Sequence, residues 1–108
     1  QPNYEPENIA AAAQCLAESG LEPAIMVDCS HANSGKKHQN QEKVWEAVLE
    51  QRAAGDQNIC ATMLESNLFE GNQKVGDNVR DLDYGVSITD ECIGWDKTEQ
   101  LLRRAAQD

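Results

Sequence analysis

One stretch of this chain, residues 24–33 (AIMVDCSHAN), constrains the fold more than any other. A mostly apolar run with a single acid passes directly into polar SHAN, as a buried strand does when it ends at a chemical site. The pattern recurs at residues 59–64 (ICATML) and at residues 86–89 (VSIT). Parallel α/β folds gather ligand-binding groups at the carboxyl ends of their strands. We therefore interpret the polar residues that end the three runs as one site: His31, Glu65 and Asp90.

Helical patterns alternate with these runs. The first helix begins near Pro6 and ends at Gly20, the second follows Ser34 as a cap and stops at Gly55, and the third starts at Asp96 and Glu99 in a capping-box-like arrangement. Their predicted buried faces are Ile9, Ala12, Ala13 and Leu16; Val44, Trp45, Val48 and Leu49; and Leu101, Leu102 and Ala105. The fold class is α/β, with about three parallel strands, the third at residues 85–89, and three helices.

Residues 66–84 show neither helical nor strand periodicity. A stretch of this length without structure is unusual in a compact domain unless it has a function, and this one leaves directly from Glu65. We expect an active-site loop. Within it, residues 70–73 (EGNQ) indicate a turn first and a substrate contact second.

Length and charge exclude several classes of protein. A chain of 108 residues suits one domain and is too short for a closed (β/α)8 barrel, which needs about 250 residues. A net charge of −10 with nine Lys and Arg argues against a nucleic-acid partner.

No apolar run approaches the length of a membrane span and no secretory signal is visible, so we expect a cytoplasmic protein. The first residue is Gln1, which suggests that the chain begins where something was cut away.

One imidazole and two carboxylates at a common point suit a divalent cation such as Mn, Fe, Co or Zn. By strand alternation, His31 shares a face with Val27 and Cys29, so that all three ligands end apolar rows facing one interior. Taken singly, such a histidine is more often a core or loop residue, and acids at strand ends are often helix caps.

Other polar residues near the site have two readings each. Asp28, an acid inside an apolar strand, either orients a metal ligand or is a hydrogen-bonded structural acid. Lys36 and Lys37 either meet a substrate phosphate or form an exposed helix entry. The cysteines show no CxxC pair and are predicted to be reduced core residues, with Cys29 and Cys92 as alternatives for a soft fourth ligand.

The sequence resembles the class I 3-deoxy-arabino-heptulosonate 7-phosphate (DAHP) synthases. The matching segments occur in family order and at family spacing: PNY at 2–4, DCSHANS at 28–34, MLESNL at 63–68, EGNQ at 70–73 and SITDECIGW at 87–95. The resemblance covers the C-terminal third of that family's TIM barrel. It implies that residues 1–108 form one part of the barrel, from the fifth helix through strands six to eight to the closing helix. The rest of the barrel would be absent.

The resemblance implies an enzyme that condenses phosphoenolpyruvate with erythrose 4-phosphate, the first step of the shikimate pathway to aromatic amino acids. The family metal is held by a Cys, a His, a Glu and an Asp. The last three match His31, Glu65 and Asp90, and the Cys belongs to the first barrel strand, outside this chain. The resemblance implies that His31 and Asp90 are catalytic, with His31 near phosphoenolpyruvate and Asp90 near the erythrose phosphate. Lys36, from its place just past the strand end, is a further predicted substrate contact.

Further expectations concern the chain alone. A chain of charge −10 without the family's phosphate-binding Arg and Lys residues is expected to be inactive on anionic substrates. Exposed sheet edges should drive self-association or pairing with the missing part of the barrel. The alternatives are a stand-alone, non-catalytic α/β binding module and another metal-dependent barrel aldolase.

Overall fold

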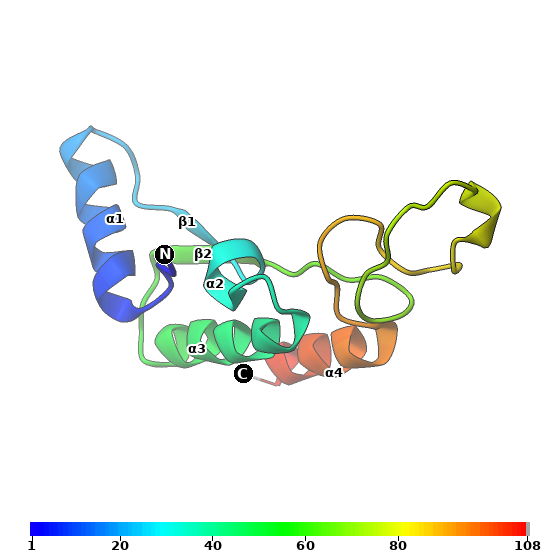
Figure 1. Cartoon of the computed structure of the whole chain (residues 1–108). Helices are drawn as coiled ribbons and strands as arrows, with labels where there is room; N and C mark the ends of the chain where they lie inside the picture. The colour runs from blue at the N-terminus through cyan, green and yellow to red at the C-terminus, as the bar shows by residue number, and fades with distance from the viewer. Residues whose placement is uncertain (108) are drawn as a thin grey trace.

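The computed structural model describes residues 1–107, which form helices around a small parallel sheet (Figure 1). In chain order the elements are α1 (Pro6–Glu18), β1 (Ile25–Asp28), α2 (His31–Ser34), η1 (His38–Asn40), α3 (Gln41–Ala53), β2 (Ile59–Met63), η2 (Val79–Asp81) and α4 (Trp95–Ala106), where η denotes a 3-10 helix. The α/β class is as predicted. There are four α-helices rather than three, because the single turn α2 follows β1 directly.

The two strands pair in parallel, and α3 is the connection between them. Val27 lies opposite Thr62 and Asp28 opposite Met63, with an irregularity in register between Ile25 and Met26. Parallel pairing brings the carboxyl ends of β1 and β2 to the same edge of the sheet. His31 and Glu65 follow these two ends.

The predicted third strand at residues 85–89 is wrong, since within residues 1–107 the sheet contains only β1 and β2. The segment forms a single isolated bridge, between Ser87 and Asn72. The backbone N–H of Thr89 donates to Oγ of Ser87 at 3.1 Å, so a local side-chain bond takes the donor that a strand ladder would need.

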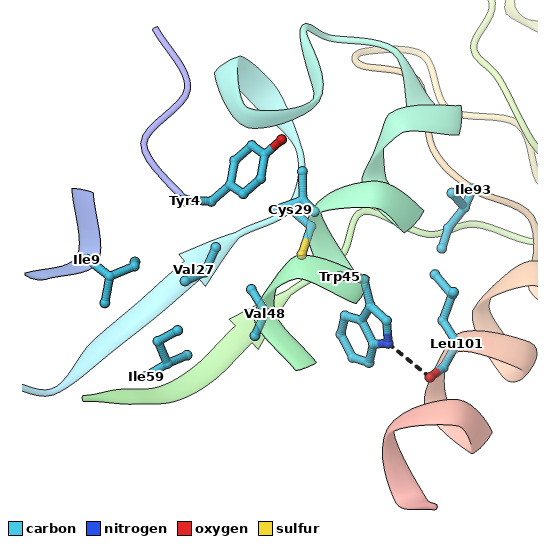
Figure 2. Packing of buried hydrophobic residues seen from close by; sticks show 10 residues of the cluster. Tyr4, Ile9, Val27, Cys29, Trp45, Val48, Ile59, Ile93 and Leu101 are labelled. Carbon is cyan, nitrogen blue, oxygen red and sulfur yellow. Dashed lines mark hydrogen bonds between the residues drawn. The ribbon is translucent and has the colours of Figure 1, made fainter. Parts of the chain in front are cut away.

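A core of ten buried residues joins the sheet to the helices, and Figure 2 shows nine of them labelled. Val27 and Ile59 come from the two strands, while Val48 and Trp45 come from α3. The indole Nε1 of Trp45 donates to the backbone carbonyl of Leu101 at 3.1 Å, which links α3 to α4 (Figure 2). This core fixes the two strands whose ends carry polar residues.

The predicted helical face of α3 is confirmed for Val44, Trp45 and Val48, which are buried, whereas Leu49 is half-buried; the other helices need correction. In α1 the buried residues are Ile9 and Ala13, whereas Ala12 is exposed. In α4, Leu102 is 52% exposed, because the buried face runs through Thr98 and Leu101.

The predicted helix caps are wrong. Ser34 lies inside α2 and donates through Oγ to the carbonyl of His31, while the N-cap of α3 is Asn40. The N-cap of α4 is Gly94, so Asp96 falls in the first turn. Glu99 instead pairs with Arg103 one turn further along the helix, at 2.8 Å.

All four cysteines are free thiols, as expected for a reduced protein. Cys29 and Cys92 are buried, but Cys15 and Cys60 are exposed, so the prediction of a core position is wrong for these two. Both lie on outward positions of their elements, α1 and β2. None of the helices in residues 1–107 combines the length and the apolar content that crossing a membrane requires.

The molecule is extended. Its radius of gyration is 16.2 Å and its principal dimensions are 51 × 31 × 19 Å, whereas a compact domain of 100 residues has a radius of gyration of about 13 Å. The connection from β2 to α4, which contains η2, projects away from the sheet (Figure 1). Large apolar side chains are exposed on several elements, including Met26 at 64%, Phe69 at 58% and Trp95 at 58%.

Candidate functional site

His31 occupies the turn between β1 and α2. Its φ of +48° is uncommon for a residue with a side chain. Asp28, the last residue of β1, accepts from the backbone N–H of Ser30 at 2.8 Å through Oδ1, and its Oδ2 lies 2.7 Å from Nδ1 of His31. Asp28 therefore orients the imidazole so that Nε2 faces away from the strand. The sequence left two roles open for Asp28, and the structure fits both. Its carboxylate contacts the candidate ligand His31 and accepts a hydrogen bond within the turn.

The predicted common face of His31 with Val27 and Cys29 is wrong. Val27 is 3% exposed and Cys29 is fully buried in the core, whereas the His31 side chain is 46% exposed. Strand alternation ends with β1 at Asp28, and the left-handed backbone at His31 redirects the imidazole.

Glu65 follows β2 by two residues, and its carboxylate is 23% exposed. Its backbone is held by the side chain of Gln41, the first residue of α3. Oε1 of Gln41 accepts from the Glu65 N–H at 2.8 Å, and Nε2 of Gln41 donates to the Glu65 carbonyl at 3.0 Å.

Asp90 lies in an irregular segment that is fixed by its neighbours. The backbone groups of Cys92 and Gly71 exchange two hydrogen bonds of 2.9 and 3.1 Å. The carboxylate of Glu91 accepts from the backbone N–H of His38 at 3.1 Å and lies 2.6 Å from its Nδ1. These contacts hold Asp90 beside the ends of β1 and β2 without a third strand.

The structure brings His31, Glu65 and Asp90 together, as expected from sequence. Nε2 of His31 lies 2.9 Å from Oε1 of Glu65 and 3.3 Å from Oδ2 of Asp90. One ligand atom from each residue falls within 4.8 Å of the others, an arrangement that could hold a metal ion. One imidazole nitrogen and two carboxylate oxygens suit Mn, Fe, Co or Zn, and the Asp28 contact at Nδ1 leaves Nε2 available.

The electrostatics of the site favour a cation. The pKa of His31 is raised above its ordinary value, first by the hydrogen bond with Asp28 and then by the charges of Asp28, Glu65 and Asp90. Three acids thus surround one imidazole, and a positive charge at Nε2 is stabilised, whether a proton or a metal ion carries it.

Cys29 and Cys92 are not members of this ligand group among the described residues. The Cys29 Sγ lies 3.1 Å from Oγ1 of Thr62. Burial raises the pKa of both thiols, and a protonated thiol is a poor metal ligand.

Lys36 lies just after α2, with a positive φ of 62°, and is exposed. Its backbone N–H donates to the carbonyl of His31 at 2.9 Å, while its ammonium forms no ion pair with residues in the described range. Lys37 is also exposed, so the structure supports the helix-entry reading of both lysines. A contact with substrate stays a prediction.

The EGNQ segment stabilises the long loop. Nε2 of Gln73 donates to the carbonyls of Asp83 and Val86 at 2.9 and 3.0 Å, and its Oε1 accepts from the Asp83 N–H at 2.9 Å. Asn72 donates through Nδ2 to the carbonyl of Thr89. These amides account for the order of a stretch that has no periodic pattern.

Sequence reasoning missed Gln41 and the pair of His38 with Glu91. Neither has a motif signal, since both act on backbone or partners far along the chain. A glutamine at the predicted start of a helix reads as a surface residue, yet Gln41 is fully buried.

A sequence model described as the DAHP synthetase I family matches residues 1–103. The chain belongs to this family. This member of the DAHP synthetase I family is 44% identical over 107 residues to the Tyr-sensitive phospho-2-dehydro-3-deoxyheptonate aldolase of Escherichia coli (strain K12). The alignment covers 99% of the chain and 30% of that relative. It is 45% identical to the tyrosine-inhibited phospho-2-dehydro-3-deoxyheptonate aldolase of Schizosaccharomyces pombe (strain 972 / ATCC 24843), over 98% of the chain and 29% of that relative.

Solved structures agree with this assignment. The phospho-2-dehydro-3-deoxyheptonate aldolase from Francisella tularensis SCHU S4 superimposes on 98% of the chain with a TM-score of 0.90 at 35% identity, and the match covers 30% of that protein. The chain thus spans about 30% of the length of these three relatives.

Proposed function

We propose that the full-length protein containing these residues is a DAHP synthase, which condenses phosphoenolpyruvate with erythrose 4-phosphate at the entry to aromatic amino acid biosynthesis. The observation that carries the proposal is the convergence of His31, Glu65 and Asp90 on one point in a chain of the DAHP synthetase I family. The relatives named phospho-2-dehydro-3-deoxyheptonate aldolase support it.

We assign residues 1–107 to the C-terminal part of a (β/α)8 barrel, from its fifth helix to its eighth helix. The parallel pair of strands joined by α3 is the repeating unit of such a barrel. The extended shape supports the assignment, because the open edges of the sheet would pair with neighbouring strands and the exposed Met26 on β1 would be covered by side chains from the rest of the barrel. The polar residues then lie at the carboxyl end of the barrel, where active sites of this fold occur.

The candidate metal ligands fit a divalent cation, which would polarise the aldehyde oxygen of the acceptor sugar. Asp28 holds Nδ1 of His31 and keeps Nε2 directed at the two carboxylates. Glu65 and Asp90 supply two negative oxygens that balance the charge of the ion. The Asp90 and His31 side chains are 47% and 46% exposed, so both are accessible to substrate.

The chain alone is proposed to be inactive. The two substrates are anionic, and the chain carries a net charge of −10 with only nine Lys and Arg residues. Binding of both substrates then depends on basic residues elsewhere in the barrel. The chain is proposed to associate with further copies of itself, or with the rest of the barrel when that part is supplied.

The test uses the full-length protein, freed of metal and then supplied with Mn²⁺, phosphoenolpyruvate and erythrose 4-phosphate. His31→Ala and Glu65→Ala should abolish both Mn²⁺ binding, measured by calorimetry, and turnover. Glu46→Ala is the matched control, because Glu46 lies on α3 and faces Arg104 of α4. Wild-type binding in either site variant would contradict the assigned ligands. Turnover with other aldehydes but not with erythrose 4-phosphate would identify a different aldolase.

A further inference from the structure

Gln41 is a fully buried polar residue whose side chain has both of its hydrogen-bonding groups directed at a single residue, Glu65. The separation in sequence is 24 residues, and the contact joins the start of α3 to the turn after β2. The Glu65 N–H needs an acceptor and its carbonyl needs a donor, so the amide orientation of Gln41 is set by its partners.

The two hydrogen bonds from Gln41 hold the Glu65 backbone beyond the end of β2. β2 ends at Met63, so the sheet does not hold the backbone of Glu65. Gln41 binds the peptide groups on both sides of the Glu65 Cα atom, at 2.8 and 3.0 Å, and the N–H of Ile93 adds a further bond of 3.0 Å to the Glu65 carbonyl. Because both peptide groups are held, the direction of the Glu65 Cα–Cβ bond is restricted, and Oε1 of Glu65 lies 2.9 Å from Nε2 of His31.

We propose that Gln41 is a positioning residue for the metal ligand Glu65. The inference rests on the proposed function, because it assigns a role within the same metal centre. Gln41 sets the backbone from which the carboxylate extends, and it touches neither substrate nor cation. Without it, the carboxylate of Glu65 samples more orientations and the cation binds less tightly.

The chain offers a matched control on the same helix. Gln51 is also a buried glutamine of α3, 9% exposed, and its Nε2 donates to the backbone carbonyl of Tyr4 at 2.8 Å. This bond fixes the N-terminal segment, ten residues along α3 from Gln41. Replacement of either glutamine by methionine keeps the side-chain length and removes the hydrogen bonds. Both changes lower stability, but only the change at Gln41 reaches the metal site.

The experiment compares wild type, Gln41→Met and Gln51→Met in the full-length protein, with Mn²⁺ affinity measured by calorimetry and folding by thermal melting. Gln41→Met should weaken Mn²⁺ binding by about tenfold or more. Gln51→Met should leave the affinity unchanged, and it should lower the melting temperature less than Gln41→Met does, because it removes one hydrogen bond rather than two. Gln41→Asn serves if Gln41→Met does not fold, since it keeps a neutral amide on a side chain shorter by one methylene, and it should also weaken Mn²⁺ binding.

Wild-type affinity in the folded Gln41 variants would overturn the inference and leave the proposed function intact. Equal loss of affinity in the Gln41 and Gln51 variants would also overturn it, because a general loss of stability would then explain both. Failure of the wild-type protein to bind Mn²⁺ is a separate result, which removes the proposed metal centre and the role of Gln41 with it.

Discussion

A single carboxylate, that of Asp28, supports two neighbours at the end of β1. One oxygen accepts from the backbone N–H of Ser30 and the other contacts Nδ1 of His31. In this arrangement the imidazole donates from Nδ1, so that Nε2 keeps a free lone pair when the ring is neutral. The orientation and the tautomer of His31 thus depend on one acid within the apolar strand.

Asp28→Asn should therefore weaken Mn²⁺ binding by about 10- to 100-fold. The amide can still accept from Ser30, but its NH₂ group would donate to Nδ1 of His31 and place the imidazole proton on Nε2. Calorimetric titration of the full-length protein would measure the change. Asp56→Asn is the control, because Asp56 makes the same kind of turn contact with the N–H of Asn58. Equal affinities for wild type and Asp28→Asn would contradict this role.

Mn²⁺ binding should weaken as the pH falls through the raised pKa of His31, since the proton and the cation compete for Nε2. Below that pKa the affinity should decrease by up to about tenfold for each pH unit. The stability of the metal-free protein depends on pH in the opposite direction, since it decreases as the pH rises. The interaction with Asp28 stabilises the fold fully below the unfolded pKa of histidine and is lost as the pH rises through the folded pKa. Affinity that is constant from acidic to neutral pH would rule out His31 as a ligand.

At the level of single residues, the sequence identified His31, Glu65 and Asp90, but it located Asp90 through a strand that is absent from residues 1–107 and did not predict the geometry around the three side chains. Apolar runs ending in His31 and Glu65 identified two strand ends, because hydrophobic patterning reports burial. The reversal at His31 was not predictable, since a positive φ at a histidine depends on the bonds that Asp28 makes. Gln41 was missed for a related reason, because its partner is a backbone 24 residues away.

Among the elements, the connection between β2 and α4 differs most from expectation. Patterning predicted the positions of α1, α3 and β2 well, although α1 buries only Ile9 and Ala13 of its predicted face and β2 buries only Ile59. Residues 85–89 have strand-like composition, yet their hydrogen bonds go to Ser87 Oγ and to the EGNQ segment. Such pairings have no period and could not be predicted from alternation.

The packing of this connection gives a test at Gly85. Its φ is +75°, and an added Cβ would lie 2.9 Å from Cβ of Leu68 and 3.0 Å from Cδ2 of Phe69. Gly85→Ala should destabilise the full-length protein by about 1–3 kcal/mol, measured by chemical denaturation. Gly76→Ala is the matched control on the same connection, because an added Cβ there meets nothing within 4 Å. If the two variants are equally stable, the turn at Gly85 does not constrain the connection.

For the whole molecule, the open shape is the dominant feature. The radius of gyration of 16.2 Å and the exposed apolar side chains on β1 and near α4 describe surfaces that need cover. Residues 1–108 in isolation should self-associate in light scattering and should show no turnover of phosphoenolpyruvate with erythrose 4-phosphate. A monodisperse monomer would contradict the first expectation, and measurable synthase activity would contradict the second.

The three candidate ligands lie at positions 31, 65 and 90, in segments that follow one another along the chain. During synthesis on a ribosome, the histidine and the glutamate emerge with the two strands, but the group of three side chains stays incomplete until the segment around Asp90 has left the exit tunnel and attached to His38 through Glu91. If the three residues bind a cation as proposed, the ion can be captured only after this step of synthesis. A nascent polypeptide arrested before that point would lack Asp90 beside His31 and Glu65, and the candidate metal site would be incomplete.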